Sequence, residues 1–183
     1  MRVVGGRKRG TLLIGFDREE VRPTLDRGKE SMFNIIQFDI EGRTVLDLFA
    51  GSGQLGIEAL SRGADYAVFV DKSQTSIDHI TQNIKNTGFE DKSKVIRGDY
   101  SAVLMGMNTE FDYVFLDPPY ASDFLIKALS LVQKCVKDHG LIICEHPKEQ
   151  ELPSQVGEFV LKKAYRYGKI VLSVYHRKGE ENE

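Results

Sequence analysis

The stretch that decides the fold is Thr44-Val45-Leu46-Asp47-Leu48-Phe49-Ala50-Gly51-Ser52-Gly53-Gln54-Leu55-Gly56. Residues 44–49 form a short apolar run, which predicts a buried strand. Residues 50–56 form a glycine-rich turn, and apolar residues at Leu55, Ala59 and Leu60 predict a helix after it. A strand, a glycine turn and a helix in this order are typical of an α/β sheet that binds a ligand at the turn.

Strands and helices alternate from this stretch to residue 145. Short apolar runs predict further strands at residues 67–70, 94–97, 112–116 and 141–144. Apolar residues at helical spacing predict one helix that begins at Ser73 and another over residues 124–137. The alternation predicts a parallel, doubly wound sheet.

Both ends of the chain carry the pattern of a β-hairpin. Alternating apolar residues in 159–161 and 170–174 predict an antiparallel hairpin that closes the sheet. Residues 2–4 and 11–14 are β-prone, and the basic, glycine-rich segment between them predicts a mobile hairpin tip. A loop is expected at residues 15–23, with Thr24 as the N-cap of the next helix. That helix carries an apolar stripe of Leu25, Met32, Phe33 and Ile36.

The length of 183 residues is that of one domain with its own core. A hydrophobic content of 41% and a charged content of 28% are ordinary for a soluble globular protein. We expect a single domain over residues 1–178, with a basic hairpin extension at 1–21 and the core at 22–178. The last five residues, 179–183, are expected to be disordered.

Several classes of protein are excluded by the composition. No apolar run approaches the length of a membrane span, and the N-terminus lacks the apolar centre of a signal peptide. Cys135 and Cys144 lie in apolar segments, which predicts buried thiols in a reducing cytoplasm. The four histidines show no ligand spacing, so we expect no metal site.

The net charge of −2 hides an asymmetry along the chain. Residues 1–30 carry 8 basic and 5 acidic side chains (+3), and residues 162–178 carry 6 basic and no acidic ones (+6). Residues 31–161 carry 11 basic and 19 acidic side chains (−8). Basic ends on an acidic body are typical of a protein that binds a polyanion at its edges, with scattered solvated charges as the alternative. The candidate phosphate contacts are Arg7, Lys8, Arg9 and Arg22.

The glycine turn matches the dinucleotide pattern Gly51-x-Gly53-x-x-Gly56, and Asp71 lies twenty residues past its first glycine. Two cofactors suit this arrangement, a nicotinamide dinucleotide and S-adenosylmethionine, because in both an acid binds ribose hydroxyls. Asp47 could help to hold an α-ammonium group, and Asp99 could accept from an adenine amino group, which favours S-adenosylmethionine. Strand-end capping is the alternative role for both carboxylates.

A second motif, Asp117-Pro118-Pro119-Tyr120, follows the predicted strand at 112–116. Two consecutive prolines cannot extend a central strand, because each lacks an N–H and fixes φ. The chain therefore leaves the sheet in a stiff turn, at the edge where open α/β sheets bind ligands. Asp117 and the Pro118 carbonyl could accept the hydrogens of a planar amine, and Tyr120 could stack on its ring. A rigid turn with a surface tyrosine is the structural alternative.

With these residues in place, the chain resembles the class I S-adenosylmethionine-dependent methyltransferases. It most resembles the RsmD family, which methylates the exocyclic N2 of a guanine in 16S ribosomal RNA. The resemblance runs from Arg2 to Arg177, and the N-terminal hairpin with Arg22-Pro23-Thr24 points to this family, since Asp-Pro-Pro-Tyr is shared with DNA adenine methyltransferases. The matching segments are Arg2 to Gly6, Arg22 to Arg27, Glu30 to Asn34, Asp47 to Gly53, Gly56 to Ala64 and Asp117 to Tyr120.

The resemblance implies a Rossmann-like fold with a doubly wound, mostly parallel seven-stranded sheet, a C-terminal antiparallel hairpin and a small N-terminal β-hairpin extension. It implies S-adenosylmethionine as cofactor and guanine 966 of 16S ribosomal RNA as target, in free RNA or in a 30S assembly intermediate. We expect a cytoplasmic monomer. The implied cofactor-binding residues are Thr24, Asp47, Phe49, Gly51, Gly53, Asp71, Lys72, Asp99, Tyr100 and Asp117. The implied catalytic residues are Asp117, Pro118 and Tyr120, and the implied RNA contacts are Arg7, Lys8, Arg9 and Arg22.

The implied reaction is a single in-line methyl transfer that needs no metal and no covalent enzyme intermediate. Asp117 and the Pro118 carbonyl would orient the poorly nucleophilic N2 of guanine towards the methyl group, and Tyr120 would stack the unstacked base. Three alternatives stay open from the sequence. A DNA N6-adenine methyltransferase would use the same site, a nicotinamide oxidoreductase would need a proton donor near the ring, and a non-enzymatic RNA-binding module would leave the Asp117 motif without a role.

Overall fold

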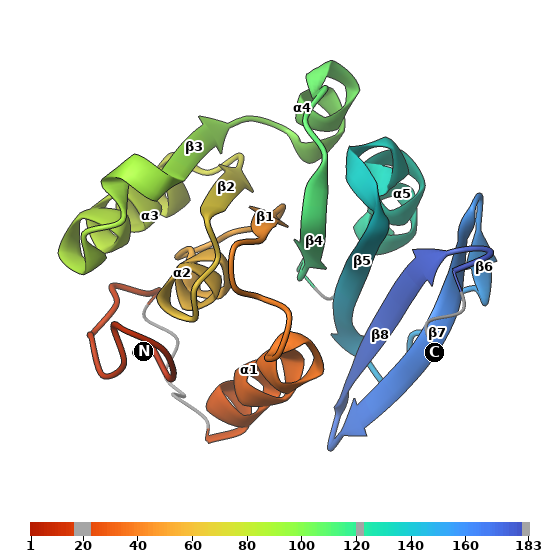
Figure 1. Cartoon of the computed structure of the whole chain (residues 1–183), viewed down its shortest axis with the longest axis horizontal. Helices are drawn as coiled ribbons and strands as arrows, with labels where there is room; N and C mark the ends of the chain where they lie inside the picture. The colour runs from red at the N-terminus through yellow and green to blue at the C-terminus, as the bar shows by residue number, and fades with distance from the viewer. Residues whose placement is uncertain (17–22, 120–122, 181–183) are drawn as a thin grey trace.

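A single mixed sheet organises the chain, with its strands in the order β3-β2-β1-β4-β5-β8-β7-β6 (Figure 1). The computed structural model describes residues 1–16, 23–119 and 123–180. The strands are β1 (Thr44–Asp47), β2 (Tyr66–Asp71), β3 (Ser93–Arg97), β4 (Phe111–Leu116), β5 (Val136–Pro147), β6 (Gln155–Val156), β7 (Phe159–Tyr167) and β8 (Ile170–Arg177). The helices are α1 (Pro23–Ile36), α2 (Gln54–Ser61), α3 (Gln74–Thr87), α4 (Tyr100–Gly106) and α5 (Phe124–Val132), with 3-10 turns η1 (Glu90–Lys92) and η2 (Gln133–Cys135).

The pairing of the strands confirms a doubly wound sheet closed by a hairpin. Strands β1 to β5 pair in parallel, and β8 joins β5 in the antiparallel direction. Among the described residues the sheet has eight strands rather than the expected seven, because two-residue β6 pairs with the beginning of β7. A strand of two residues shows no alternation of apolar and polar side chains, so the sequence pattern could not reveal it.

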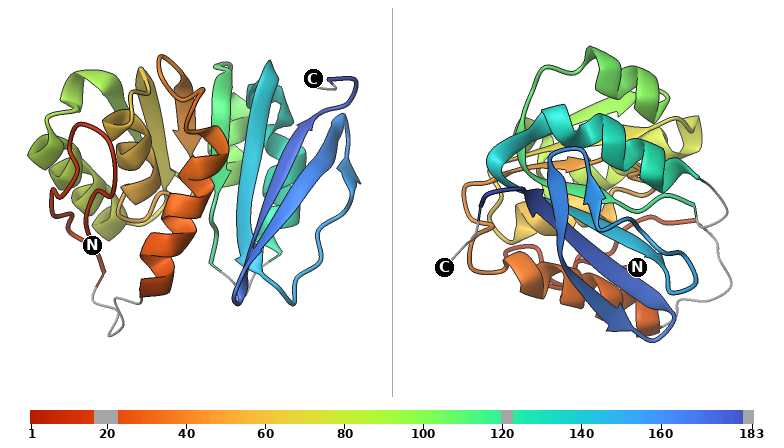
Figure 2. Two further views of the ribbon diagram at one scale, coloured as in Figure 1. Left: turned by 60° about the horizontal axis from the view of Figure 1, so that its bottom comes forward. Right: turned by 90° about the vertical axis from the view of Figure 1, so that its right-hand side faces the viewer.

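Helices cover both faces of the sheet (Figure 2, right), and an apolar core lies on each face. On one face, buried side chains of α1, α2 and α3 pack on the strands, among them Phe33, Ile57 and Ile80. On the other face, α4 and α5 supply Leu104 and Leu129. The central parallel strands β1, β2 and β4 are therefore buried on both sides, as in other sheets of parallel strands.

Three element boundaries differ from the sequence prediction. The helix expected over 124–137 ends at Val132, because Val136 already pairs with β4 as the first residue of β5. Helix α1 begins at Pro23, so Thr24 lies inside its first turn and the N-cap prediction is wrong. Helix α4 was not predicted, since only Leu104 of its seven residues is buried and so short a segment shows no stripe.

The N-terminal hairpin docks along α2. The antiparallel bridge between Arg2 and Leu12 confirms the hairpin itself. At its tip, the N–H of Arg7 donates to the carbonyl of Ser61 (2.7 Å), and the N–H of Lys8 donates to the Ser61 hydroxyl (2.9 Å). The expectation of a mobile tip is therefore wrong for the backbone, because these bonds fix it to the last residue of α2.

A buried ionic cluster holds the hairpin against the core. Glu58 on α2 is fully buried, and its carboxylate accepts from the N–H groups of Val4 (2.9 Å) and Gly5 (2.7 Å). The same carboxylate accepts from Nε of Arg62 at 2.8 Å and lies 3.7 Å from Nζ of Lys29 on α1. Lys29 is 4% exposed and donates to a carbonyl of the hairpin's first strand (2.9 Å). Buried charges are tolerated when they are paired and hydrogen-bonded, so this cluster joins the hairpin, α1 and α2.

Some sequence predictions fall outside the described residues. These are Arg22 with most of the loop at 15–23, Tyr120, and residues 181–183 of the expected tail. Glu180 of that tail is described, and its Oε1 lies 2.9 Å from Nδ1 of His139. Within the described ranges, no helix combines the length and the apolar character that a membrane span requires.

Candidate active site

The glycine turn joins β1 to α2 at the carboxyl edge of the parallel strands (Figure 1). Gly51 and Gly53 have φ angles of 59° and 80°, in the left-handed region that favours glycine. A Cβ on Gly56 would clash with the ring of Phe69 on β2, so the third glycine permits the close packing of α2 on the sheet. All three glycines are therefore required by the shape of the turn itself.

Asp47 lies beneath this turn and is only 1% exposed. Its Oδ2 accepts from the N–H of Gly56 (3.0 Å), which ties the end of β1 to the first turn of α2. Burial raises the pKa of its carboxyl to about 7, with the Gly56 N–H acting against the rise and the charge of Asp71 adding to it. Its predicted contact with an α-ammonium group stays a prediction, since protein atoms cover almost all of the side chain.

Asp71 ends β2 next to the turn. The N–H of Gly51 donates to its Oδ2 (2.9 Å), and the N–H of Ser73 donates to its Oδ1 (2.9 Å). An ionised carboxylate offers about four acceptor positions, so Asp71 keeps capacity for the hydroxyls of a ribose. The structure thus places Asp71 against the backbone of the glycine turn, and its contact with the ribose hydroxyls of a cofactor stays a prediction.

Asp99 follows β3 and is the N-cap of α4, not the last residue of the strand. Its Oδ1 accepts from the Ser101 hydroxyl and from the N–H of Ser101 (3.0 Å). These hydrogen bonds, the hydroxyl first, lower the pKa of the Asp99 carboxyl, and the charge of Lys72 lowers it further. Asp47 and Asp71 are the last residues of β1 and β2, and Asp99 lies two residues after β3. Since these three strands are neighbours, the three acids lie at the carboxyl ends of adjacent strands.

Three aromatic rings gather beside Asp99. The ring of Phe49, which follows β1, lies 5.1 Å from that of Tyr100 between centroids, and Tyr100 lies 5.7 Å from Phe124 at the start of α5. Phe124 escaped the sequence analysis because it lies off the apolar stripe of its helix. Aromatic rings beside a carboxylate are suited to bind a planar heterocycle that carries an amino group.

The Asp117 turn leaves the sheet at the same edge. Strand β4 pairs with β1 and ends at Leu116, after which Asp117 is half-buried and Pro118 is buried. The carbonyl of Pro118 is followed by the nitrogen of Pro119, which has no hydrogen. The structure therefore places Asp117 and Pro118 after β4 at the carboxyl edge of the sheet, as predicted, and the pairing of β4 with β1 brings them next to the glycine turn.

A second carboxylate stands next to this turn, and the sequence analysis missed it. Leu116 of β4 is level with Cys144 of β5, so Glu145 is level with Asp117. Ile143 belongs to the core under α1, α2 and α3, and alternation along β5 directs Glu145 to the same face. In the sequence Glu145 is merely the end of an apolar run, and only the pairing of β4 with β5 reveals its position.

The second strand of the hairpin passes over the glycine turn. Asn83 of α3 is fully buried, and its Oδ1 accepts from the N–H of Ile14 (2.7 Å). Its Nδ2 donates to the carbonyls of Ile14 (2.8 Å) and Ser52 (2.9 Å). The ring of Phe16 lies beside Gly51. Asn83 was also missed, because a single polar residue on a helical stripe is usually solvent-exposed.

The basic hairpin tip lies at the other end of α2 (Figure 2, left). The glycine turn begins this helix, whereas Arg7 and Lys8 bind its last residue, Ser61. A helix of eight residues is about 12 Å long, so the tip is roughly that far from the turn. Arg7, Lys8 and Arg9 are exposed, but the structure separates them from the edge that carries Asp117.

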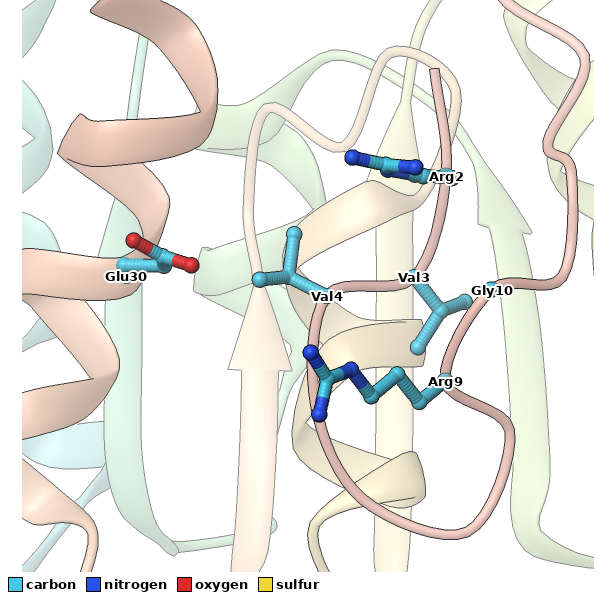
Figure 3. A pocket seen from close by; sticks show the side chains of 6 residues that line it. All are labelled: Arg2, Val3, Val4, Arg9, Gly10 and Glu30. Atoms are coloured by element: carbon cyan, nitrogen blue, oxygen red, sulfur yellow. The ribbon is translucent and has the colours of Figure 1, made fainter.

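Arg9 shares an open pocket with Arg2 between the hairpin and α1 (Figure 3). The guanidinium groups of both arginines point towards the gap, across which Glu30 lies on α1. The pocket has a volume of about 220 Å³ and is lined by Arg2, Val3, Val4, Arg9, Gly10 and Glu30. It is smaller than the roughly 300 to 1,000 Å³ of typical ligand sites and contains none of the strand-end acids, so we place the reactive site at the strand edge.

Comparison with known proteins identifies the family. The family described as Conserved hypothetical protein 95 matches residues 1–176. YlbH of Bacillus subtilis (strain 168), which carries the name of an rRNA methyltransferase, is 39% identical over 98% of this chain and 100% of its own length. Ribosomal RNA small subunit methyltransferase D of Escherichia coli (strain K12) is 30% identical over 98% of this chain and 91% of its own length. The solved structure of the methyltransferase yhhF from Escherichia coli has a TM-score of 0.86 at 31% identity and covers 97% of both chains. The chain belongs to the RsmD family of ribosomal RNA methyltransferases.

Proposed function

We propose that this chain is an S-adenosylmethionine-dependent methyltransferase that modifies the exocyclic N2 of a guanine in 16S ribosomal RNA. The observation that carries the proposal is that the candidate cofactor-binding acids and the Asp117 turn lie at the same edge of the sheet. Asp71 ends β2, Asp99 follows β3, and the turn at Asp117 that is proposed to bind the amine follows β4. The names of the relatives support ribosomal RNA as substrate, and guanine 966 is the target that the family resemblance implies.

The residues at this edge fit S-adenosylmethionine. Asp71 has acceptor capacity for the ribose hydroxyls, and Asp99 with the rings of Phe49 and Tyr100 suits an adenine base. Asp47 lies beneath the glycine turn, where a dinucleotide would place its pyrophosphate, and the negative charge of an ionised Asp47 disfavours that group. The cofactor, when bound, supplies an electrophilic methyl group on its sulfonium.

Asp117 and the Pro118 carbonyl hold the nucleophile. They accept the two hydrogens of the guanine amine, which directs the nitrogen lone pair towards the methyl group. As the N–C bond forms and the S–C bond breaks, positive charge grows on the amine, and the same acceptors stabilise it. Asp117 then receives the proton that leaves the nitrogen, directly or through water. Tyr120 stacks on the base in this proposal.

Glu145 provides a reason for guanine rather than adenine. The N1 of guanine carries a hydrogen next to the exocyclic amine, whereas the N1 of adenine is an acceptor. A carboxylate beside Asp117 therefore attracts the guanine edge and repels that of adenine. Replacing Glu145 by Gln should reduce the preference for guanine, whereas an unchanged preference would remove Glu145 from base recognition.

Radiolabelled methyl transfer to 16S ribosomal RNA, to 30S particles and to DNA tests the proposal. Digestion of the product should give N2-methylguanosine, and Asp117→Ala should abolish most of the turnover while S-adenosylhomocysteine binds as before. N6-methyladenine in DNA would overturn the choice of substrate. Normal turnover by Asp117→Ala would overturn the role of the turn, and tighter binding of NAD than of S-adenosylhomocysteine would overturn the cofactor.

A further inference from the structure

We infer that the exposed part of β7 and the β7–β8 turn bind the RNA strand that flanks the target base. This surface, the β7 basic edge, consists of Lys162, Lys163, Tyr165, Arg166, Tyr167 and Lys169. The identity of the ligand, an unpaired RNA segment, rests on the proposed function. The location, the charge and the aromatic rings of the surface do not depend on the proposed function.

The β7 basic edge combines positive charge with aromatic rings. Its four basic side chains are exposed, and residues 162–178 contain no acidic residue. Nζ of Lys163 lies 4.7 Å from the centroid of the Tyr165 ring, and Tyr167 is 38% exposed. Surfaces of this kind bind unpaired nucleic acid, because bases stack on the rings while phosphates pair with the cations.

The strand itself is open on one side. Strand β6 pairs only with Phe159 and Val160, so residues 162–167 form an edge of the sheet in the described part of the chain. Alternation along β7 places Lys163, Tyr165 and Tyr167 on one face. Lysines on an edge strand also discourage association between sheets, which is the competing explanation for this charge.

The register of the sheet brings the β7 basic edge to the border of the candidate active site. Leu116 at the end of β4 is level with Cys144 on β5. Three residues farther along β5, Pro147 pairs with Ile170 on β8, and Ile170 pairs in turn with Tyr167 on β7. At about 3.3 Å per residue, the turn reaches roughly 10 Å beyond the level of Leu116, and it lies three strands, about 14 Å, to the side. Figure 2 (left) shows the end of β4, the start of α1 and the β7–β8 turn at the same lower edge.

The charge distribution supports this position. Carboxylates at the strand ends repel a phosphate backbone from the centre of the site, so the backbone must be held at its rim. The N-terminal tip lies at the opposite end of α2, next to Ser61. In the part of the chain that the structure describes, the hairpin tip is therefore remote from Asp117, whereas the β7 basic edge borders it.

The test compares two triple variants of the full chain that lose the same charge. One carries Lys163→Ala, Arg166→Ala and Lys169→Ala. The control carries Lys85→Ala, Lys92→Ala and Lys94→Ala, which lie on α3, η1 and β3 at the other end of the sheet. Binding of a single-stranded RNA oligonucleotide is measured by fluorescence anisotropy at several salt concentrations, with self-association followed by light scattering.

The β7 variant should bind more weakly, and its slope of log affinity against log salt should flatten by about two units relative to the control. Tyr167→Ala should weaken binding at least about fivefold, and Tyr167→Phe should restore it. Equal affinities and slopes for the two triple variants would overturn the inference, as would a β7 variant that only self-associates more.

Methyl transfer measured on the same proteins separates this inference from the proposed function. Binding that depends on the β7 basic edge, without guanine methylation by the wild type, would retain the surface and overturn the proposed function. If the wild type methylates guanine while the β7 variant keeps full RNA binding and turnover, the proposed function is retained and the RNA-binding role of the β7 basic edge is overturned. A wild-type chain that binds no RNA would overturn both.

Discussion

Replacing Asp47 by Asn tests the electrostatic cost of the carboxyl group beneath the glycine turn. Burial raises the pKa of this carboxyl in the folded chain from 3.8 to about 7. At intermediate pH the folded state holds a proton that the unfolded state has already lost, so this group lowers stability as pH rises from about 4 to about 7. Asn has the same shape, accepts from the N–H of Gly56 through its carbonyl oxygen, and has no proton to lose in this range.

The magnitude follows from the difference between the two pKa values. One pKa unit corresponds to about 1.4 kcal/mol. Between about pH 5 and about pH 8, the raised pKa removes about 2 to 3 kcal/mol from the free energy of unfolding of the wild type. The Asp47→Asn chain should lack this decrease and should gain that amount relative to the wild type across the same range.

Urea unfolding at a series of pH values, without cofactor, measures the effect. The matched control is Asp91→Asn on η1, which makes the same chemical change at an exposed position. Parallel stability profiles for the wild type and Asp47→Asn would refute the reasoning. The same pair of proteins tests the α-ammonium contact, since a cation held by Asp47 would favour its ionised form and make S-adenosylhomocysteine bind more tightly above pH 7 in the wild type alone.

Three further changes test other parts of the structure. Asp71→Ala should weaken the binding of S-adenosylhomocysteine by about 1 to 3 kcal/mol, measured by calorimetry. Unfolding is measured alongside because Asp71 also holds the glycine turn, and an unchanged affinity would remove Asp71 from the cofactor site. Glu58→Gln removes the negative charge that Lys29 and Arg62 pair with in the buried cluster and should cost about 3 to 5 kcal/mol in urea unfolding, so a loss below about 1 kcal/mol would contradict the pairing. Changing Arg7, Lys8 and Arg9 together to Ala should weaken RNA binding and flatten its salt slope by about two to three units without affecting folding or cofactor affinity, and identical slopes would make the tip an ordinary solvated hairpin.

The sequence by itself determined the parts of this protein that depend on short segments. The apolar run before Gly51 and the strands and helices that follow predicted the parallel sheet, because burial imposes a period on neighbouring residues. Two consecutive prolines after β4 predicted the turn at Asp117, because proline cannot continue a central strand. The predicted hairpins at both ends were also present, since each joins residues close in the chain.

The tertiary structure alone decided which distant segments meet. The level of Glu145 with Asp117 depends on the register between β4 and β5, whose paired residues are far apart in the sequence. The same applies to Asn83, which bonds to Ile14 and to the glycine turn. The sequence showed the charge of the hairpin tip and of β7 but not where each lies relative to the site; docking of the tip on Ser61 and pairing of β7 with β8 decide this. Local periodicity reports which side of a segment is buried, whereas register and docking depend on the complementary surface of another segment, which no single stretch of sequence contains.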